Sequence, residues 1–211
     1  MKKLLLGNEA VARGLYEAGC RVASSYPGTP STEITEYAAK YEDIYCEWAP
    51  NEKVAMEVAC GAAIAGARSF CAMKHVGLNV ACDPLFTASY TGVNAGMVIA
   101  VADDPGMHSS QNEQDSRHHA QASKTMMLEP SDSAECLAYT KLAYELSEQF
   151  DTPVILRLST RVSHSRSLSE TAERVDNGVK DYVKDPQKYV MMPAMAKGRH
   201  VVVEERFQAE T

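Results

Sequence analysis

The chain has 211 residues, of which 45% are hydrophobic and 23% charged, and its formal net charge is −7. Such a chain can form one globular domain with a large core plus an appendage, and its negative charge argues against nucleic acid or an anionic membrane as a partner. The apolar run after Met1 stops at Gly7, which is too short for a signal peptide or a membrane span, so we expect a cytoplasmic protein.

Helices and short apolar strands alternate through the first 158 residues. Helices are predicted over 8–18, from 31 or 32 to about 40, from 51 onward, over 78–91, and from 131 or 132 to 150. Strands are predicted over 21–25, 44–48, 69–73, 96–102 and 153–158. This alternation predicts an α/β fold, with a mostly parallel sheet covered by helices on both faces.

Ligands of such sheets bind beyond the carboxyl ends of the strands. The loops expected there span residues 26–32, 49–52, 74–77 and 103–123, and they hold the unusual polar residues of the chain. The second of these loops ends at Asn51, a helix cap, and Glu52, which opens a helix rich in small residues. We therefore predict one site at this edge, with Glu52 at its centre.

The chain changes character after about Ser165. Residues 171–206 mix basic and acidic side chains and are interrupted by Pro186, Pro193 and Gly198. We predict that residues 1–165 form the domain and that residues 166–211 form a polar linker or arm directed toward another domain or chain.

The cysteines show no C-x-x-C spacing, which argues against an iron–sulfur or zinc site made by this chain alone. We expect reduced, buried thiols. The six residues are Cys20, Cys46, Cys60, Cys71, Cys82 and Cys136.

Four separated stretches resemble, in order, the N-terminal domain of the 2-oxoacid:ferredoxin oxidoreductases. They are SYPGTPSTEI, NEKVAMEVACGAAIAGARSF, KHVGLN and DDPGMHSSQNEQDSRHHAQ. The chain is most similar to the alpha subunit of the indolepyruvate enzymes, over roughly residues 1–165. The resemblance implies a domain that binds the pyrimidine ring of thiamine diphosphate.

In that family a second domain holds the diphosphate and magnesium through a Gly-Asp-Gly…Asn motif, and a ferredoxin-like segment carries iron–sulfur clusters. This chain has neither motif. The resemblance therefore implies a fragment or a separate subunit, whose cofactor site forms in a homodimer or with a partner subunit.

The resemblance assigns a catalytic role to Glu52. A carboxyl group there hydrogen-bonds a ring nitrogen and favours the imino tautomer, which removes the proton from the thiazolium C2. The alternative is an acid that only complements the helix dipole. Glu57, five residues on, is expected to be a surface or interface acid.

The resemblance places further residues around the cofactor and substrate. Pro27, Gly28 and Thr29 would line the cofactor, with the Thr29 hydroxyl facing the ring or the substrate carboxylate; the alternative is an ordinary turn. His75 and Gly77 would lie beside the cofactor, with His75 also reaching the substrate; the alternative is a solvent-facing histidine.

Arg117 would bind the substrate carboxylate, although the spacing after it differs from that of relatives. The alternative is a polar loop that contacts a second subunit. The nearby group of His108, His118, His119 and Asp115 lacks the ligand spacing of a metal site, so none is predicted.

The implied reaction is the oxidative decarboxylation of an aryl pyruvate with coenzyme A, giving an acyl-CoA, carbon dioxide and reduced ferredoxin. Two alternatives remain open. One is a thiamine-dependent decarboxylase subunit of the phosphonopyruvate or sulfopyruvate type, and the other is a non-catalytic assembly module with the same fold.

Overall fold

The computed structural model describes residues 1–209, and its centre is a six-stranded sheet in the order β3-β2-β4-β5-β7-β6. Every neighbouring pair of strands is parallel, as the alternating pattern predicts. The strands are β2 (Val22–Ser25), β3 (Tyr45–Trp48), β4 (Ser69–Lys74), β5 (Met97–Asp103), β6 (Met126–Leu128) and β7 (Val154–Ser159).

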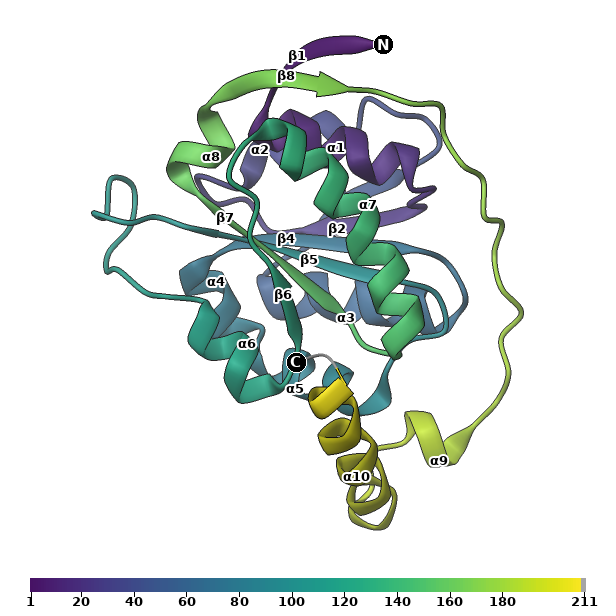
Figure 1. Cartoon of the computed structure of the whole chain (residues 1–211). Coiled ribbons are helices and arrows are strands. Elements are labelled where there is room, and N and C mark those ends of the chain that lie inside the picture. The colour runs from purple at the N-terminus through teal and green to yellow at the C-terminus, as the bar shows by residue number, and fades with distance from the viewer. Residues whose placement is uncertain (210–211) are drawn as a thin grey trace.

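Helices cover both faces of this sheet (Figure 1). One layer holds α1 (Gly7–Glu17), α2 (Thr32–Ala38) and α7 (Ser133–Phe150), and the other holds α3 (Glu52–Ile64), α4 (His75–Val80), α5 (Cys82–Thr91) and α6 (Arg117–Ser123). Side chains of one strand alternate between the layers: Phe70 lies in the first core and Cys71 in the second. The α/β prediction is therefore confirmed.

Two helices begin inside segments that were predicted to be loops. Helix α4 starts at His75 instead of residue 78, and α6 occupies the end of the 103–123 segment. The short α8 (Thr160–His164) was also not predicted. These helices have five to seven residues, too few for a hydrophobic period to be visible in the sequence.

The segment after residue 165 first forms a small second sheet. Strand β8 (Arg166–Glu170) pairs antiparallel with β1 (Lys2–Leu6), so the two ends of the domain meet. Residues 171–185, which we call the strap, then run in extended form down one side of the domain to α9 (Pro186–Tyr189) and α10 (Pro193–Ala209) (Figure 1).

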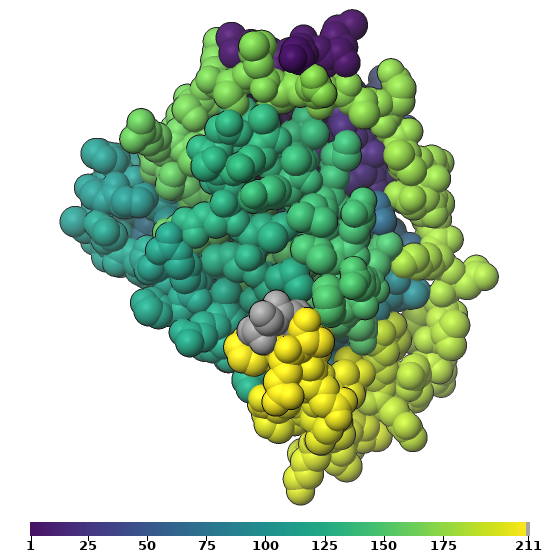
Figure 2. All heavy atoms as spheres, viewed as in Figure 1, coloured from purple at the N-terminus to yellow at the C-terminus, as the bar shows by residue number. Residues whose placement is uncertain are grey.

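The strap contacts the loops that lead into the amino ends of the sheet, opposite the predicted site. Val175 N donates to Glu17 O at 2.9 Å, and Lys180 N donates to Gly66 O at 2.9 Å. Helix α10 then packs on α5, where Arg206 donates to Ser89 O. Figure 2 shows the strap as a light-green band on the right edge of the molecule. In this structure the strap lies along its own domain; the predicted direction toward another chain stays a prediction.

None of the helices within residues 1–209 is long and apolar enough to cross a membrane.

Candidate active site

The four loops expected at the carboxyl edge of the sheet meet around one short segment, residues 74–77, at the end of β4. Each of the other three loops touches it. The contacts are the Lys74 side chain against Gly28, Lys74 Nζ donating to Ser109 O at 2.7 Å, His75 Nε2 with Asn112 O at 3.0 Å, and Gly77 against the Glu52 side chain. Parallel strand order brings these loops together although they lie far apart in sequence.

Glu52 is the first residue of α3, half-buried at the mouth of the site. Asn51 caps the helix by accepting from Val54 N at 3.0 Å, as predicted. The Glu52 side chain lies directly against Gly77, where a Cβ atom would come 2.5 Å from Oε1. Within residues 1–209 no hydrogen bond or ion pair reaches this carboxylate, so it is available to a ligand.

Glu57 lies on another face of α3. It is exposed, and its carboxylate is 3.8 Å from Lys53 Nζ, which also pairs with Asp83 at 2.8 Å. Glu57 is thus a surface acid, and Glu52 is the acid that faces the meeting loops.

Two side chains hold the backbone of the turn that carries Thr29. Gly28 N donates to Thr32 Oγ1 at 2.8 Å, and the buried Asn8 donates to Pro30 O at 2.8 Å. The Thr29–Pro30 peptide bond is cis. Thr29 itself is exposed, and its hydroxyl makes no hydrogen bond with residues 1–209. The turn therefore presents Thr29 outward on a fixed backbone.

His75 is fully buried, so the alternative of a solvent-facing histidine is wrong. It opens α4 directly after the buried strand β4 and lies under the 103–116 segment. Lys74, one residue earlier, is half-buried, and its ammonium group reaches the same segment.

A buried ion pair that the sequence analysis missed lies at the ends of β5 and β7. Asp103 and Arg157 are both buried, and Arg157 Nε donates to Asp103 Oδ2 at 2.8 Å. Asp103 also accepts a hydrogen bond from Ser116 N at 3.1 Å. Arg157 also donates to Glu129. The available signal was a charged residue inside the apolar strand VILRLS, since such a residue is rarely buried without a partner.

Arg117 lies at the start of α6 and is paired inside the chain. Its guanidinium donates to Glu129 at 2.7 Å and to Asp115 at 3.1 Å, while its side chain is 54% exposed. The hydrogen bond from Arg117 lowers the pKa of Glu129. Burial alone would raise the pKa of Asp115, but hydrogen bonding to the Arg117 backbone and the nearby arginines lower it. Two carboxylates of the same chain therefore already hold the Arg117 guanidinium.

Asp104 fixes the base of the loop between β5 and α6. It accepts from Ser109 N at 2.7 Å, from Ser110 Oγ at 2.8 Å and from Thr160 Oγ1 at 2.8 Å. Burial alone would raise the pKa of this carboxyl, but these hydrogen bonds lower it to about 2. Asp104 is therefore a structural anion at neutral pH.

Residues 1–209 contain no group of three or more His, Cys, Asp or Glu side chains that could hold a metal ion. His119, one member of the predicted polar cluster, instead contacts Asn79, with 3.0 Å between Nε2 and Oδ1. At this edge of the sheet the carboxyl group of Glu52 lies at the start of a helix, against Gly77, and the fixed turn that carries Thr29 lies at the same edge.

Comparison with known proteins shows the family to which this chain belongs. The profile of the pyruvate flavodoxin/ferredoxin oxidoreductase family, thiamine diphosphate-binding domain, matches residues 13–209. The indolepyruvate oxidoreductase subunit IorA of Methanothermobacter thermautotrophicus is 51% identical over an alignment of 203 residues, and the match covers 94% of this chain and 33% of that protein. The subunit of the same name from Pyrococcus horikoshii is 47% identical over an alignment of 208 residues, and the match covers 94% of this chain and 32% of that protein.

A solved structure shares the fold. The 2-oxoglutarate:ferredoxin oxidoreductase from Magnetococcus marinus, with 2-oxoglutarate, coenzyme A and succinyl-CoA bound, matches with a TM-score of 0.80 and 18% identity. The match covers 99% of this chain and 45% of that one. The chain thus spans about a third of the length of the indolepyruvate oxidoreductase subunits and less than half of the solved enzyme.

Proposed function

The chain belongs to the pyruvate flavodoxin/ferredoxin oxidoreductase family through its thiamine diphosphate-binding domain, and from that premise we propose that it forms the pyrimidine-binding half of an indolepyruvate oxidoreductase active site. The complete enzyme would decarboxylate an aryl pyruvate oxidatively, forming an acyl-CoA and carbon dioxide and passing two electrons to ferredoxin. The identity of about 50% with indolepyruvate oxidoreductase subunits supports this choice of substrate class.

One observation carries the proposal: the free carboxyl group of Glu52 beside Gly77. The missing Cβ at Gly77 leaves room for the Glu52 side chain, and no other group of residues 1–209 competes for its oxygens. A flat heterocycle with a ring nitrogen fits such a site, because a carboxyl group can share a proton with that nitrogen. The residues present therefore fit the pyrimidine ring of thiamine diphosphate.

When bound, thiamine diphosphate supplies the nucleophilic carbon and the electron sink for decarboxylation. In our proposal Glu52 holds a proton between its carboxyl oxygen and the ring nitrogen, and this is its catalytic role. Thr29 offers a hydroxyl group to the 2-oxoacid, while Pro27 and Gly28 shape the turn against the ring. Arg117 remains the candidate for the substrate carboxylate.

The rest of the site would come from other parts of the enzyme. We propose that a diphosphate-binding domain supplies the magnesium ligands, and that iron–sulfur clusters carried elsewhere receive the electrons. A homodimer or a partner subunit would bring this second half to Glu52. The cytoplasm is the compartment we propose, since coenzyme A and reduced ferredoxin are cofactors of the cell interior.

The test is hydrogen–deuterium exchange at C2 of thiamine diphosphate. This chain is mixed with magnesium and the candidate diphosphate-binding partner, and is compared with Glu52→Gln. We expect the variant to exchange roughly 10²–10⁴-fold more slowly, the range of general acid–base assistance. Glu57→Gln is the matched control, because Glu57 lies on the same helix but is exposed on another face, and it should exchange as fast as the wild type.

Each other outcome selects a different function. Fast exchange in Glu52→Gln would reduce Glu52 to a helix-end acid. No acceleration by the wild type with its partner would favour the non-catalytic assembly module. Aldehyde release from the oxoacid without ferredoxin reduction would favour the decarboxylase.

A further inference from the structure

The segment from Lys74 to Gly77 is the junction of the candidate site. The methylene groups of Lys74 pack on Gly28, where a Cβ atom would come 3.1 Å from Cδ, and its ammonium group donates to Ser109 O at 2.7 Å. Gly77, three residues on, contacts Glu52. A side chain in this segment that holds a neighbouring loop therefore also fixes that loop relative to Glu52.

His75 sits inside this junction with no exposed surface. Its Nε2 lies 3.0 Å from the carbonyl oxygen of Asn112. A carbonyl oxygen only accepts, so Nε2 donates the proton of this hydrogen bond. Its Nδ1 is buried and has no partner within residues 1–209. The one hydrogen bond of this imidazole thus goes to a loop backbone.

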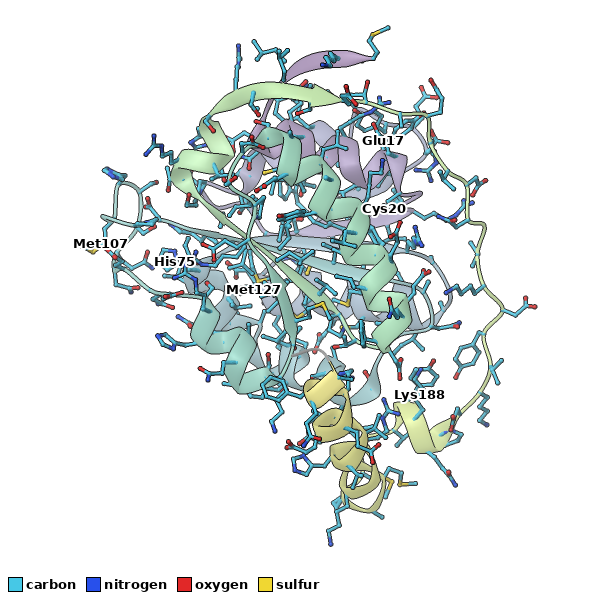
Figure 3. All side chains as sticks on the ribbon, in the orientation of Figure 1. Glu17, Cys20, His75, Met107, Met127 and Lys188 are labelled. Atoms are coloured by element: carbon cyan, nitrogen blue, oxygen red, sulfur yellow. The ribbon has the colours of Figure 1, made fainter. Side chains whose placement is uncertain are left out.

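The loop that His75 holds spans residues 104–116; Lys74 Nζ also reaches it at Ser109 O, and two carboxylates hold it from its first residues. Asp104 accepts from Ser109 N, and Asp103 accepts from Ser116 N. Between these anchors the chain projects from the domain: in Figure 3, Met107 marks the outer tip, and His75, the first residue of α4, lies inward of it. Met107 and the residues around it are exposed. The His75 contact joins the outer part of the loop to the buried strand β4.

We propose that His75 is a positioning residue, which latches the 104–116 loop onto the Lys74–Gly77 junction so that the loop forms the substrate-side wall beside Glu52. This inference rests on the proposed function, because it assumes that an oxoacid binds at this edge. It changes the role expected from the sequence, where His75 was to contact substrate or cofactor directly. A ring that is buried and committed to Asn112 O serves the loop instead.

The test compares side chains that keep or lose this one donor. In His75→Gln the amide nitrogen occupies nearly the place of Nε2 and can donate to Asn112 O. His75→Leu removes the donor at similar volume, and His75→Asn keeps a polar group that is too short to reach. Hydrogen exchange is followed at the loop amides of Met107 and Ser109, both hydrogen-bonded in this structure, in the full-length protein with its partner subunit.

We expect exchange at these amides to rise roughly tenfold in His75→Leu and His75→Asn and to stay near wild type in His75→Gln, since losing a buried hydrogen bond favours local opening of the loop. With indolepyruvate as substrate, KM should rise about tenfold in the Leu and Asn variants and recover in Gln. Thiamine diphosphate affinity and C2 exchange should change less than about twofold, because Glu52 is left in place.

Two results would overturn the proposal. One is unchanged loop exchange in both His75→Leu and His75→Asn. The other is a loosened loop with an unchanged KM, which would leave His75 a purely structural residue. If Leu disrupts the fold, seen as lost protection in β4 and β5, the Asn and Gln pair decides. A wild type that fails to use any oxoacid refutes the proposed function, while the exchange experiment still decides the latch.

Discussion

The side chain of Glu52, at the start of α3, lies directly against Gly77 of α4, 25 residues further along the sequence. A methyl group built on Gly77 would lie 2.5 Å from Oε1, 2.7 Å from Cγ and 2.8 Å from Cδ of Glu52. The absence of a side chain at residue 77 therefore sets where this carboxyl group points.

Gly77→Ala should abolish most of the activity without unfolding the protein. The three atoms nearest to the new methyl group all belong to the flexible side chain of Glu52, which swings away. Gly77 is inside α4, where alanine is more favourable than glycine by up to about 1 kcal/mol. We expect C2 exchange of thiamine diphosphate to fall roughly 10²-fold, while the melting temperature stays level or rises.

Gly61→Ala is the matched control for that experiment. Gly61 lies within α3, the helix that Glu52 begins, and no atom lies within 4 Å of the added methyl group. This variant should gain stability and keep wild-type exchange. Equal exchange in Gly77→Ala and the wild type would show that the position of Glu52 does not matter.

Thr29→Val tests whether the exposed hydroxyl group of the turn serves the substrate. Thr29 makes no hydrogen bond inside residues 1–209, so its loss should leave thermal stability unchanged. If the hydroxyl binds the oxoacid, KM should rise about five- to tenfold, as expected for one hydrogen bond. Steady-state kinetics with indolepyruvate measures this, and Thr29→Ser should restore the wild-type KM.

Thr32→Val gives the opposite pattern and so serves as the control. Thr32 Oγ1 accepts from Gly28 N at 2.8 Å, so its removal should destabilise the turn by about 1 kcal/mol. A Thr29→Val variant that loses stability but not substrate affinity would identify Thr29 as an ordinary turn residue.

Arg117→Gln tests the predicted carboxylate contact. Pairs as exposed as Arg117 with Glu129 stabilise proteins by about 0–1 kcal/mol, so the variant should stay folded. The prediction is a tenfold rise in KM for indolepyruvate. Glu129→Gln should lower KM, because it releases the guanidinium that Glu129 now holds at 2.7 Å. An unchanged KM in both variants would leave Arg117 as part of the loop's own ion-pair network.

The sheet and its two helical layers could be predicted because their signals are local. Strand β4 alternates Phe70 and Cys71 between two cores, and Asn51 caps α3 with its own side chain. The meeting of the four loops followed from parallel topology alone. The hydrogen-bond partner of each side chain did not follow: the contact of His75 with the Asn112 backbone was not predicted, and its expected contact with a ligand stays a prediction.

The strap could not be predicted because the contacts that hold it to the domain join residues far apart in sequence. Arg174 donates to Tyr16 O, 158 residues away, and Lys180 N donates to Gly66 O. No period of apolar residues marks such a segment. Its path depends on Gly66, where a Cβ atom would lie 1.9 Å from Lys180 O, so only a residue without a side chain lets the strap approach; its φ of +98° also favours glycine.

Glu148→Gln should reduce the loss of folding stability at acid pH. This variant therefore tests whether the ion pairs of Glu148 stabilise the side of the domain that the strap covers. Glu148 is 22% exposed; it accepts from Arg68 Nε and Nη2, both at 2.9 Å, and from Gly96 N at 3.0 Å, and it lies 3.4 Å from Lys180 of the strap. Burial alone would raise the pKa of Glu148, but the hydrogen bonds from Arg68 and Gly96 lower it to about 2.

Because the folded pKa lies below the ordinary value of 4.5, the unfolded chain binds the proton more tightly. The stabilisation is complete above about pH 4.5 and is lost as the pH falls toward 2, and it is on the order of 3 kcal/mol. Urea unfolding between pH 7 and pH 2 should show a smaller acid-dependent loss in Glu148→Gln than in the wild type. Glu145→Gln, an exposed neighbour on α7, should keep the full loss; parallel curves for Glu148→Gln and the wild type would mean that another carboxyl group causes the loss of stability at acid pH.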